Sequence, residues 1–224
     1  MSITPIVPAV IPVSAQDVLT QVQRLSFSRE FHLDVVDGQF APKSTWPYEP
    51  AGEPLDVKSA LDVYTLEVDL MVKEPIKAAQ QWITAGADML VFHVETLPLE
   101  VFKNFTLSTE VSIGVSCSGE TPLATLEQYL PFADYVQLMG IHTIGSQGQP
   151  FDEGVLEKIS YLKQKYPQVA LTVDGSVNQH TIQQLKAAGA DRFIVGSAIT
   201  LQENPEQAHD DLHTLINGER FARI

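Results

Sequence analysis

Eight short apolar runs alternate with helix-forming segments along this 224-residue chain, and no other feature constrains its fold as strongly. We predict strands at residues 3–11, 30–37, 65–72, 89–94, 111–116, 135–139, 169–174 and 192–195. Helices are predicted at residues 14–25, 55–61, 75–86, 98 onward, 122–130, 151–166, 178–188 and 205–216. Eight such units, in a length just below the ~250 residues typical of the fold, indicate a (β/α)8 TIM barrel.

The alternative to a barrel is an open, doubly wound sheet. Dinucleotide-binding members of that class carry a glycine-rich turn after the first strand, and this sequence has none there. The sequence Ala-Gly-Ala-Asp occurs twice, at residues 85–88 and 188–191. Because glycine at such positions ends a helix, both copies are expected to lead from a helix into a strand. We therefore predict one barrel domain over residues 1–224.

The net charge of −14 argues against several classes of partner. Nucleic acids and anionic membranes require basic patches, so neither is expected to bind, and an anionic small molecule would need a local binding loop. The single cysteine, Cys117, rules out an intramolecular disulfide and fits a reducing compartment. No apolar run approaches the ~20 residues of a membrane span. We expect a soluble, cytoplasmic protein.

Ionisable side chains stand toward the ends of several predicted strands. His32 and Asp34 are two residues apart, so on a strand both point to one face. Asp69 lies on the third strand and Asp174 ends the seventh, and the active groups of barrels gather at the carboxyl ends of strands. Buried carboxylates need a counter-charge, which a divalent cation would supply. The alternative is that these acids face water or cap the following helices.

Several short segments, taken together in their order, resemble the ribulose-phosphate 3-epimerase family over nearly the whole chain. They are His32 to Pro42, Asp69 to Val72, Phe92 to Glu95, Thr121 to Leu123, Val173 to Gly175, and Gly196 to Ile199. The pair Gly175-Ser176 is also similar to the related allulose-phosphate epimerases. The resemblance implies that Asp34 and Asp174 act as acid and base on opposite faces of the substrate. It also implies a homo-oligomer.

The resemblance further implies a divalent metal ion held by His32, Asp34, Asp69 and Asp174, with zinc, manganese, magnesium and iron all open. Two positions depart from the family pattern, because a serine of the first strand falls on Ala9 and a second metal-binding histidine falls on Asp69. One nitrogen and three carboxylate ligands favour magnesium or manganese, although zinc remains a strong competitor.

The pocket and its phosphate site are expected at the same strand ends. Glycine-containing turns follow the sixth, seventh and eighth strands, where barrels often bind phosphate, and glycine lets the main chain approach an anion closely. We expect phosphate contacts from Gly145, Ser146, Gly148, Gly175, Ser176, Gly196 and Ser197. We expect the pocket lining to include Ala9, Met71, His93 and Met139. The two methionines either shield the pocket from water or fill the core.

The expected activity is that of an isomerase that interconverts ribulose 5-phosphate and xylulose 5-phosphate, or a related ketose phosphate. One aspartate removes a proton beside the ketone, giving an enediolate, and the other returns a proton on the opposite face. A positioned acid or base contributes ~10²- to 10⁴-fold, so a metal holding the enediolate oxygens would supply the rest. The alternative, favoured by Ala9 and Asp69, is a barrel that has lost turnover and binds a phosphorylated ligand.

Overall fold

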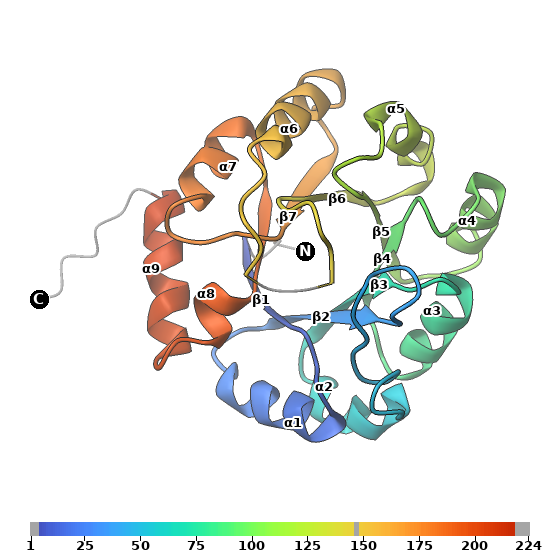
Figure 1. Ribbon diagram of the computed structural model, residues 1–224, viewed down its shortest axis with the longest axis vertical. Coiled ribbons are helices and arrows are strands. Elements are labelled where there is room, and N and C mark those ends of the chain that lie inside the picture. The colour runs from blue at the N-terminus through green and yellow to red at the C-terminus, as the bar shows by residue number, and fades with distance from the viewer. Residues whose placement is uncertain (1–4, 146–147, 218–224) are drawn as a thin grey trace, which may run out of the picture.

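The structure is a computed structural model that describes residues 5–145 and 148–217. Its eight parallel strands close into a barrel in the order β1 to β8 (Figure 1), so the predicted (β/α)8 fold is confirmed. The strands are β1 Ile6–Val10, β2 Glu30–Val36, β3 Thr65–Met71, β4 Met89–His93, β5 Ser112–Cys117, β6 Tyr135–Met139, β7 Ala170–Asp174 and β8 Arg192–Val195. Each pairs in parallel with its sequence neighbours, and β1 pairs with β8.

Helices surround the ring of strands (Figure 1). They are α1 Ala15–Arg24, α2 Lys58–Leu61, α3 Pro75–Thr84, α4 Leu99–Thr106, α5 Leu123–Leu126, α6 Gly154–Lys165, α7 Ile182–Ala188, α8 Ser197–Thr200 and α9 Pro205–Asn217. The helix predicted at 122–130 is shorter, because Pro131 disfavours α-helical geometry just before it and a 3₁₀ turn, Leu130–Phe132, follows α5. Among the described residues, no helix has both the length and the apolar character needed to cross a membrane.

Three aspartates, each directly before an even-numbered strand, tie that strand to the one preceding it. Each carboxylate accepts a hydrogen bond from the backbone N–H of a residue near the start of the preceding strand. The aspartate's own N–H donates to the carbonyl oxygen of that strand residue. The pairs are Asp88 with Leu66 (2.9 Å), Asp134 with Ile113 (2.7 Å) and Asp191 with Leu171 (2.8 Å). Asp88 and Asp191 belong to the repeated Ala-Gly-Ala-Asp sequence. Its glycines, Gly86 and Gly189, have φ of +102° and +116° and follow helices α3 and α7 as predicted.

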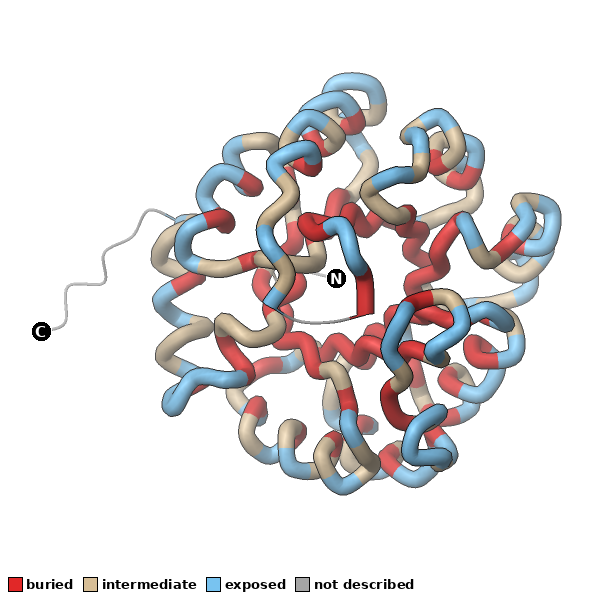
Figure 2. Tube along the Cα trace, in the orientation of Figure 1, coloured by how far each residue is buried: buried red, intermediate tan, exposed pale blue. Residues whose placement is uncertain are grey.

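Strand alternation gives the barrel an apolar outside and an inside that mixes polar and apolar side chains. Leu33 and Val35 belong to the apolar core shared with the helices, whereas His32 and Asp34, which alternate with them, point inward. Figure 2 shows the ring of strands as buried. The buried polar side chains on the strands are His32, Asp34, Glu67, Asp69, His93, Ser116, Gln137, Thr172 and Arg192. Since buried polar groups require partners, their contacts determine how the barrel interior is arranged.

Candidate active site

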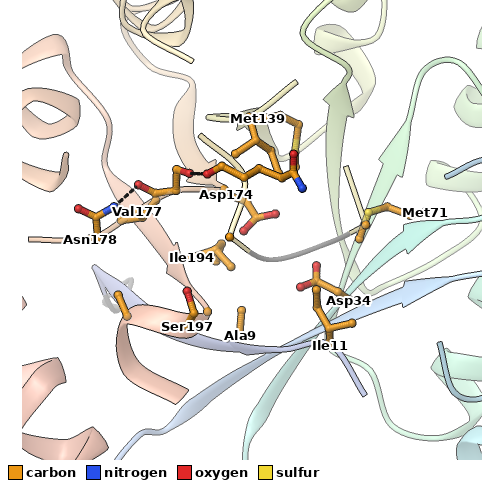
Figure 3. Close-up of a pocket in the computed structure, with 18 residues that line it drawn as sticks. Ala9, Ile11, Asp34, Met71, Met139, Asp174, Val177, Asn178, Ile194 and Ser197 are labelled. Carbon is orange, nitrogen blue, oxygen red and sulfur yellow. Dashed lines mark hydrogen bonds between the residues drawn. The ribbon is translucent and has the colours of Figure 1, made fainter. Parts of the chain in front are cut away.

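A cavity of about 180 Å³ lies at the carboxyl ends of the strands. Figure 3 shows Asp34 of β2 and Asp174 of β7 reaching into it. The sequence-predicted residues that line it are Ala9, Asp34, Met71, Met139, Gly145, Gly148, Asp174, Gly175, Ser176, Gly196 and Ser197. The structure thus brings most of the predicted site into one cavity. Ser146 lies outside the described residues.

Three of the predicted metal ligands meet at one point. Donor atoms of His32, Asp34 and Asp69 lie within 4.8 Å of one another, and all three residues are buried. Nδ1 of His32 lies 2.7 Å from Oε2 of Glu67, so its proton is donated to that carboxylate and Nε2 faces Asp34, 3.3 Å away. A histidine held in this way presents Nε2 as a metal ligand. The group therefore fits a divalent metal ion; Asp174 stands outside it, at the cavity wall.

Burial and neighbouring charges shift the pKa values of the site residues. Burial, and then the charge of Asp34, raise the pKa of Asp174 well above its ordinary value. Burial also raises the pKa of Asp34, although the hydrogen bond from His32 acts in the opposite direction. Burial alone would lower the pKa of His32, but the charge of Glu67 and the bond to Asp34 raise it well above the usual value. A cation among these carboxylates would stabilise their ionised forms.

Asp69 on β3 accepts hydrogen bonds from side chains on β4 and β6. His93 Nε2 donates to one of its carboxylate oxygens (2.9 Å) and Gln137 Nε2 to the other (2.8 Å). His93 was expected at the pocket, but it is fully buried and lies outside the cavity lining. Its position at a strand end favoured the pocket; the structure turns its ring toward Asp69, because a buried carboxylate requires donors. The Phe40 ring packs against it, with centroids 5.3 Å apart.

A second buried network lies behind His32, and the sequence analysis missed it. Glu67 accepts hydrogen bonds from Tyr135 (2.5 Å) and from Arg192 (2.7 Å), in addition to His32. Arg192 also pairs with Glu30 at 3.0 Å. Burial would raise the pKa of Glu67, but Arg192 and His32 outweigh it and hold that pKa far below the usual range. The available signal was alternation, since Glu67 precedes Asp69 by two residues and shares its inward face.

The loops after β7 and β8 bring backbone groups to the cavity. Gly175 and Ser176 both have positive φ, +93° and +52°, and the Ser176 hydroxyl donates to the carbonyl of Gln149. This bond ties the loop after β7 to the loop after β6. Gly196 and Ser197 stand at the start of α8, where main-chain N–H groups lack helical partners. All four of these glycine and serine residues line the cavity, beside Asp174.

A closed (β/α)8 barrel with paired carboxylates in a cavity at its carboxyl mouth is the architecture of a barrel enzyme. Comparison of the sequence with known families places it more narrowly. The chain belongs to the ribulose-phosphate 3-epimerase family, whose sequence model matches residues 5–200.

Individual relatives agree with this assignment. The chain is 35% identical to the ribulose-phosphate 3-epimerase of Treponema pallidum (strain Nichols) over 175 residues, covering 75% of this chain and 77% of the relative. It is 32% identical to that of Bacillus subtilis (strain 168) over 190 residues, covering 81% and 84%.

Solved structures support the fold alone. A 3-hexulose-6-phosphate synthase has a TM-score of 0.70 at 16% identity, covering 95% of this chain and 100% of that one. KGPDC from Streptococcus mutans, in complex with D-R5P, has a TM-score of 0.74 at 14% identity, covering 96% and 97%.

Proposed function

We propose that this protein is a metal-assisted sugar-phosphate 3-epimerase, which inverts the carbon beside the ketone of ribulose 5-phosphate or a related ketose phosphate. Family membership supports the reaction class. The observation that carries the proposal is the meeting of Asp34 and Asp174 in one cavity, next to a group that fits a divalent metal ion.

The two aspartates are suited to opposite halves of one proton transfer. Burial raises the pKa of both carboxyls, and the charge of Asp34 raises that of Asp174 further, so Asp174 can hold a proton while Asp34 is ionised. The ionised group removes the proton from the carbon beside the ketone, and the protonated group delivers one to the opposite face. With the substrate epimer reversed, the two exchange roles. Met71 and Met139 line the cavity and limit water around the reacting carbon.

His32, Asp34 and Asp69 would hold the metal ion, with Glu67 fixing the orientation of the imidazole. When bound, a divalent cation supplies positive charge for the oxygens of the enediolate. Two carboxylates and one imidazole are a donor set rich in hard oxygen, which supports manganese or magnesium as the working ion. Main-chain N–H groups of the loops after β7 and β8 bind the phosphate, which the net charge of −14 would otherwise repel.

Two observations favour a second candidate function, a phosphate-ligand-binding barrel without turnover. Ala9 contributes no polar side chain to the cavity, and both oxygens of Asp69 already accept hydrogen bonds. In this alternative the cavity binds the sugar phosphate, but the carbon-bound proton is not exchanged.

Solvent exchange into the substrate separates the two functions. Incubation with ribulose 5-phosphate in deuterium oxide is expected to place deuterium at the carbon beside the ketone, as followed by proton NMR. Removing metal with a chelator should lower this exchange by about 10²- to 10³-fold, the cost of losing one electrostatic stabiliser of the transition state, and added manganese should restore it. If the protein binds the sugar phosphate saturably but exchanges no proton with zinc, manganese, magnesium or iron added, it is a phosphate-ligand-binding barrel without turnover.

The remaining predictions concern the state of the protein. A homo-oligomer and a cytoplasmic location remain expectations from the sequence, and light scattering of the purified protein would determine the number of copies.

A further inference from the structure

Three polar atoms without a hydrogen-bond partner, within the described part of the chain, lie side by side in the barrel wall. They are Nδ1 of His93, Oγ of Ser116 and Oε1 of Gln137. The three residues are 0% exposed and stand on consecutive strands, β4, β5 and β6. They are also in register, since His93 pairs with Ser116 and Ser116 pairs with Gln137. Neighbouring strands are only ~4.8 Å apart, so the three side chains form one row.

The outer members of this row converge on the same carboxylate. His93 Nε2 and Gln137 Nε2 donate to the two oxygens of Asp69, at 2.9 and 2.8 Å. Ser116 stands between them in the strand register and is itself fully buried. None of the three row residues lines the cavity, and Met139, which does, lies against Gln137 with its sulfur 3.9 Å from Nε2. The row therefore lies outside the lining of the substrate cavity.

The unpartnered atoms are chemically complementary to one molecule. A carboxylate only accepts, so the Gln137 amide must turn its nitrogen to Asp69 and leave its carbonyl oxygen as an acceptor. Likewise His93 donates from Nε2, and its Nδ1 accepts in the neutral ring or donates in the protonated ring, either of which a water molecule can match. The Ser116 hydroxyl can donate. Each such group costs about 1–3 kcal/mol if buried unpaired, and polar compartments with two to four partners hold buried water.

We propose that His93, Ser116 and Gln137 bind one buried water molecule, and that this water positions the Asp69 carboxylate. The water accepts from the Ser116 hydroxyl, donates to Gln137 Oε1 and forms a hydrogen bond with His93 Nδ1. It thereby fixes the two donors that hold Asp69 toward His32 and Asp34. Ser116 touches neither the metal group nor the substrate and is a positioning residue. The role of Asp69 as a ligand rests on the proposed function, whereas the water site does not.

The test combines crystallography with metal affinity. A high-resolution crystal structure of the metal-free protein should show one water within hydrogen-bonding distance of all three atoms. Ser116→Ala should weaken manganese binding, measured by equilibrium dialysis, by about tenfold, the lower end of the cost of losing an outer-sphere partner. Ser112→Ala is the matched control, because Ser112 starts the same strand and its hydroxyl contacts Asp134 instead. This variant should bind manganese like the parent protein.

The outcomes separate the two proposals. A row without water in the parent crystals, or an unchanged manganese affinity in Ser116→Ala, overturns the inference. If the parent protein binds no manganese, the metal part of the proposed function fails. In that case the conformation of Asp69 in crystals of the Ser116→Ala variant decides the inference. An Asp69 side chain that keeps its place there contradicts a positioning role, and a displaced one supports it.

Discussion

Asp174→Asn is expected to lower proton exchange into ribulose 5-phosphate by about 10³-fold, within the ~10²- to 10⁴-fold contribution of a positioned acid or base. The amide fills nearly the same space in the cavity wall but can neither remove nor deliver a proton. Deuterium incorporation, followed by NMR, measures the change. Circular dichroism verifies that the barrel is retained. Exchange at the parental rate would show that Asp174 moves no proton.

The same substitution should stabilise the metal-free protein at neutral pH. The pKa of Asp174 is raised in the folded state, so the folded protein binds this proton more tightly than the unfolded chain does. Its contribution to stability is therefore lost as the pH rises from the ordinary carboxyl value near 4 through the raised pKa. Asparagine carries no charge, so we expect the free energy of unfolding at pH 7 to be higher for the variant than for the parent protein.

Urea unfolding of the metal-free proteins at pH 4 and pH 7 tests this expectation. The gain should largely disappear at pH 4, where the folded protein holds the proton and about half of the unfolded chains do. Asp62→Asn is a suitable control, since the Asp62 side chain is 53% exposed and forms a surface pair with Lys58 at 3.6 Å. A variant at position 174 that is less stable than the parent at both pH values would contradict an unbalanced charge at that position.

Glu67→Gln is expected to lower the free energy of unfolding by about 3–5 kcal/mol at pH 7, the usual cost of removing one partner of a buried ion pair. The guanidinium of Arg192 would lose the charge of its closest carboxylate, and the His32 Nδ1 proton would face a neutral amide oxygen, which is a weaker acceptor than a carboxylate. Manganese affinity should fall by about 10- to 100-fold as the imidazole loses its orientation. Urea unfolding and equilibrium dialysis measure the two effects.

The pH dependence of this variant has the opposite sign to that of Asp174→Asn. The pKa of Glu67 is lowered in the folded state, so its contribution is present above the ordinary value near 4.3 and is lost as the pH falls toward the lowered pKa. The stability difference should therefore narrow in acid. Glu30→Gln is the matched control, because Arg192 keeps Glu67 and His32 keeps its acceptor. An unchanged manganese affinity in Glu67→Gln would refute its orienting role.

The sequence predicted the features that depend on neighbours in the chain. The barrel follows from alternating runs, and His32 with Asp34 follows from a two-residue spacing on one strand. The partners that hold these groups are distant in sequence: Glu67 is 35 residues from His32, and Arg192 is 125 residues from Glu67. Which inward-facing residues meet depends on the register of the closed barrel, which local patterns do not specify.

Asp69 is a further case in which local sequence patterns do not reveal the contacts of a side chain. The family resemblance implied that Asp69 is a metal ligand, and the structure brings a donor atom of Asp69 within 4.8 Å of those of His32 and Asp34. The two donors that engage it, His93 and Gln137, come from β4 and β6. In the sequence of β6, Gln137 stands out as a polar residue among apolar ones, but nothing local indicates that it contacts Asp69.

The hydrogen bonds of Asp88, Asp134 and Asp191 place strand-to-strand attachment at one end of the barrel and the cavity at the other. They join β3 to β4, β5 to β6 and β7 to β8 at the strand starts, at the end opposite the cavity. Barrel stability is commonly built into that end, and catalysis into the other. Six of the eight strands thus form two-strand units that are joined by these aspartate hydrogen bonds, and the cavity loops take no part in them. Protein engineering could therefore exchange the cavity loops to seek new substrates while the hydrogen bonds within each two-strand unit are kept.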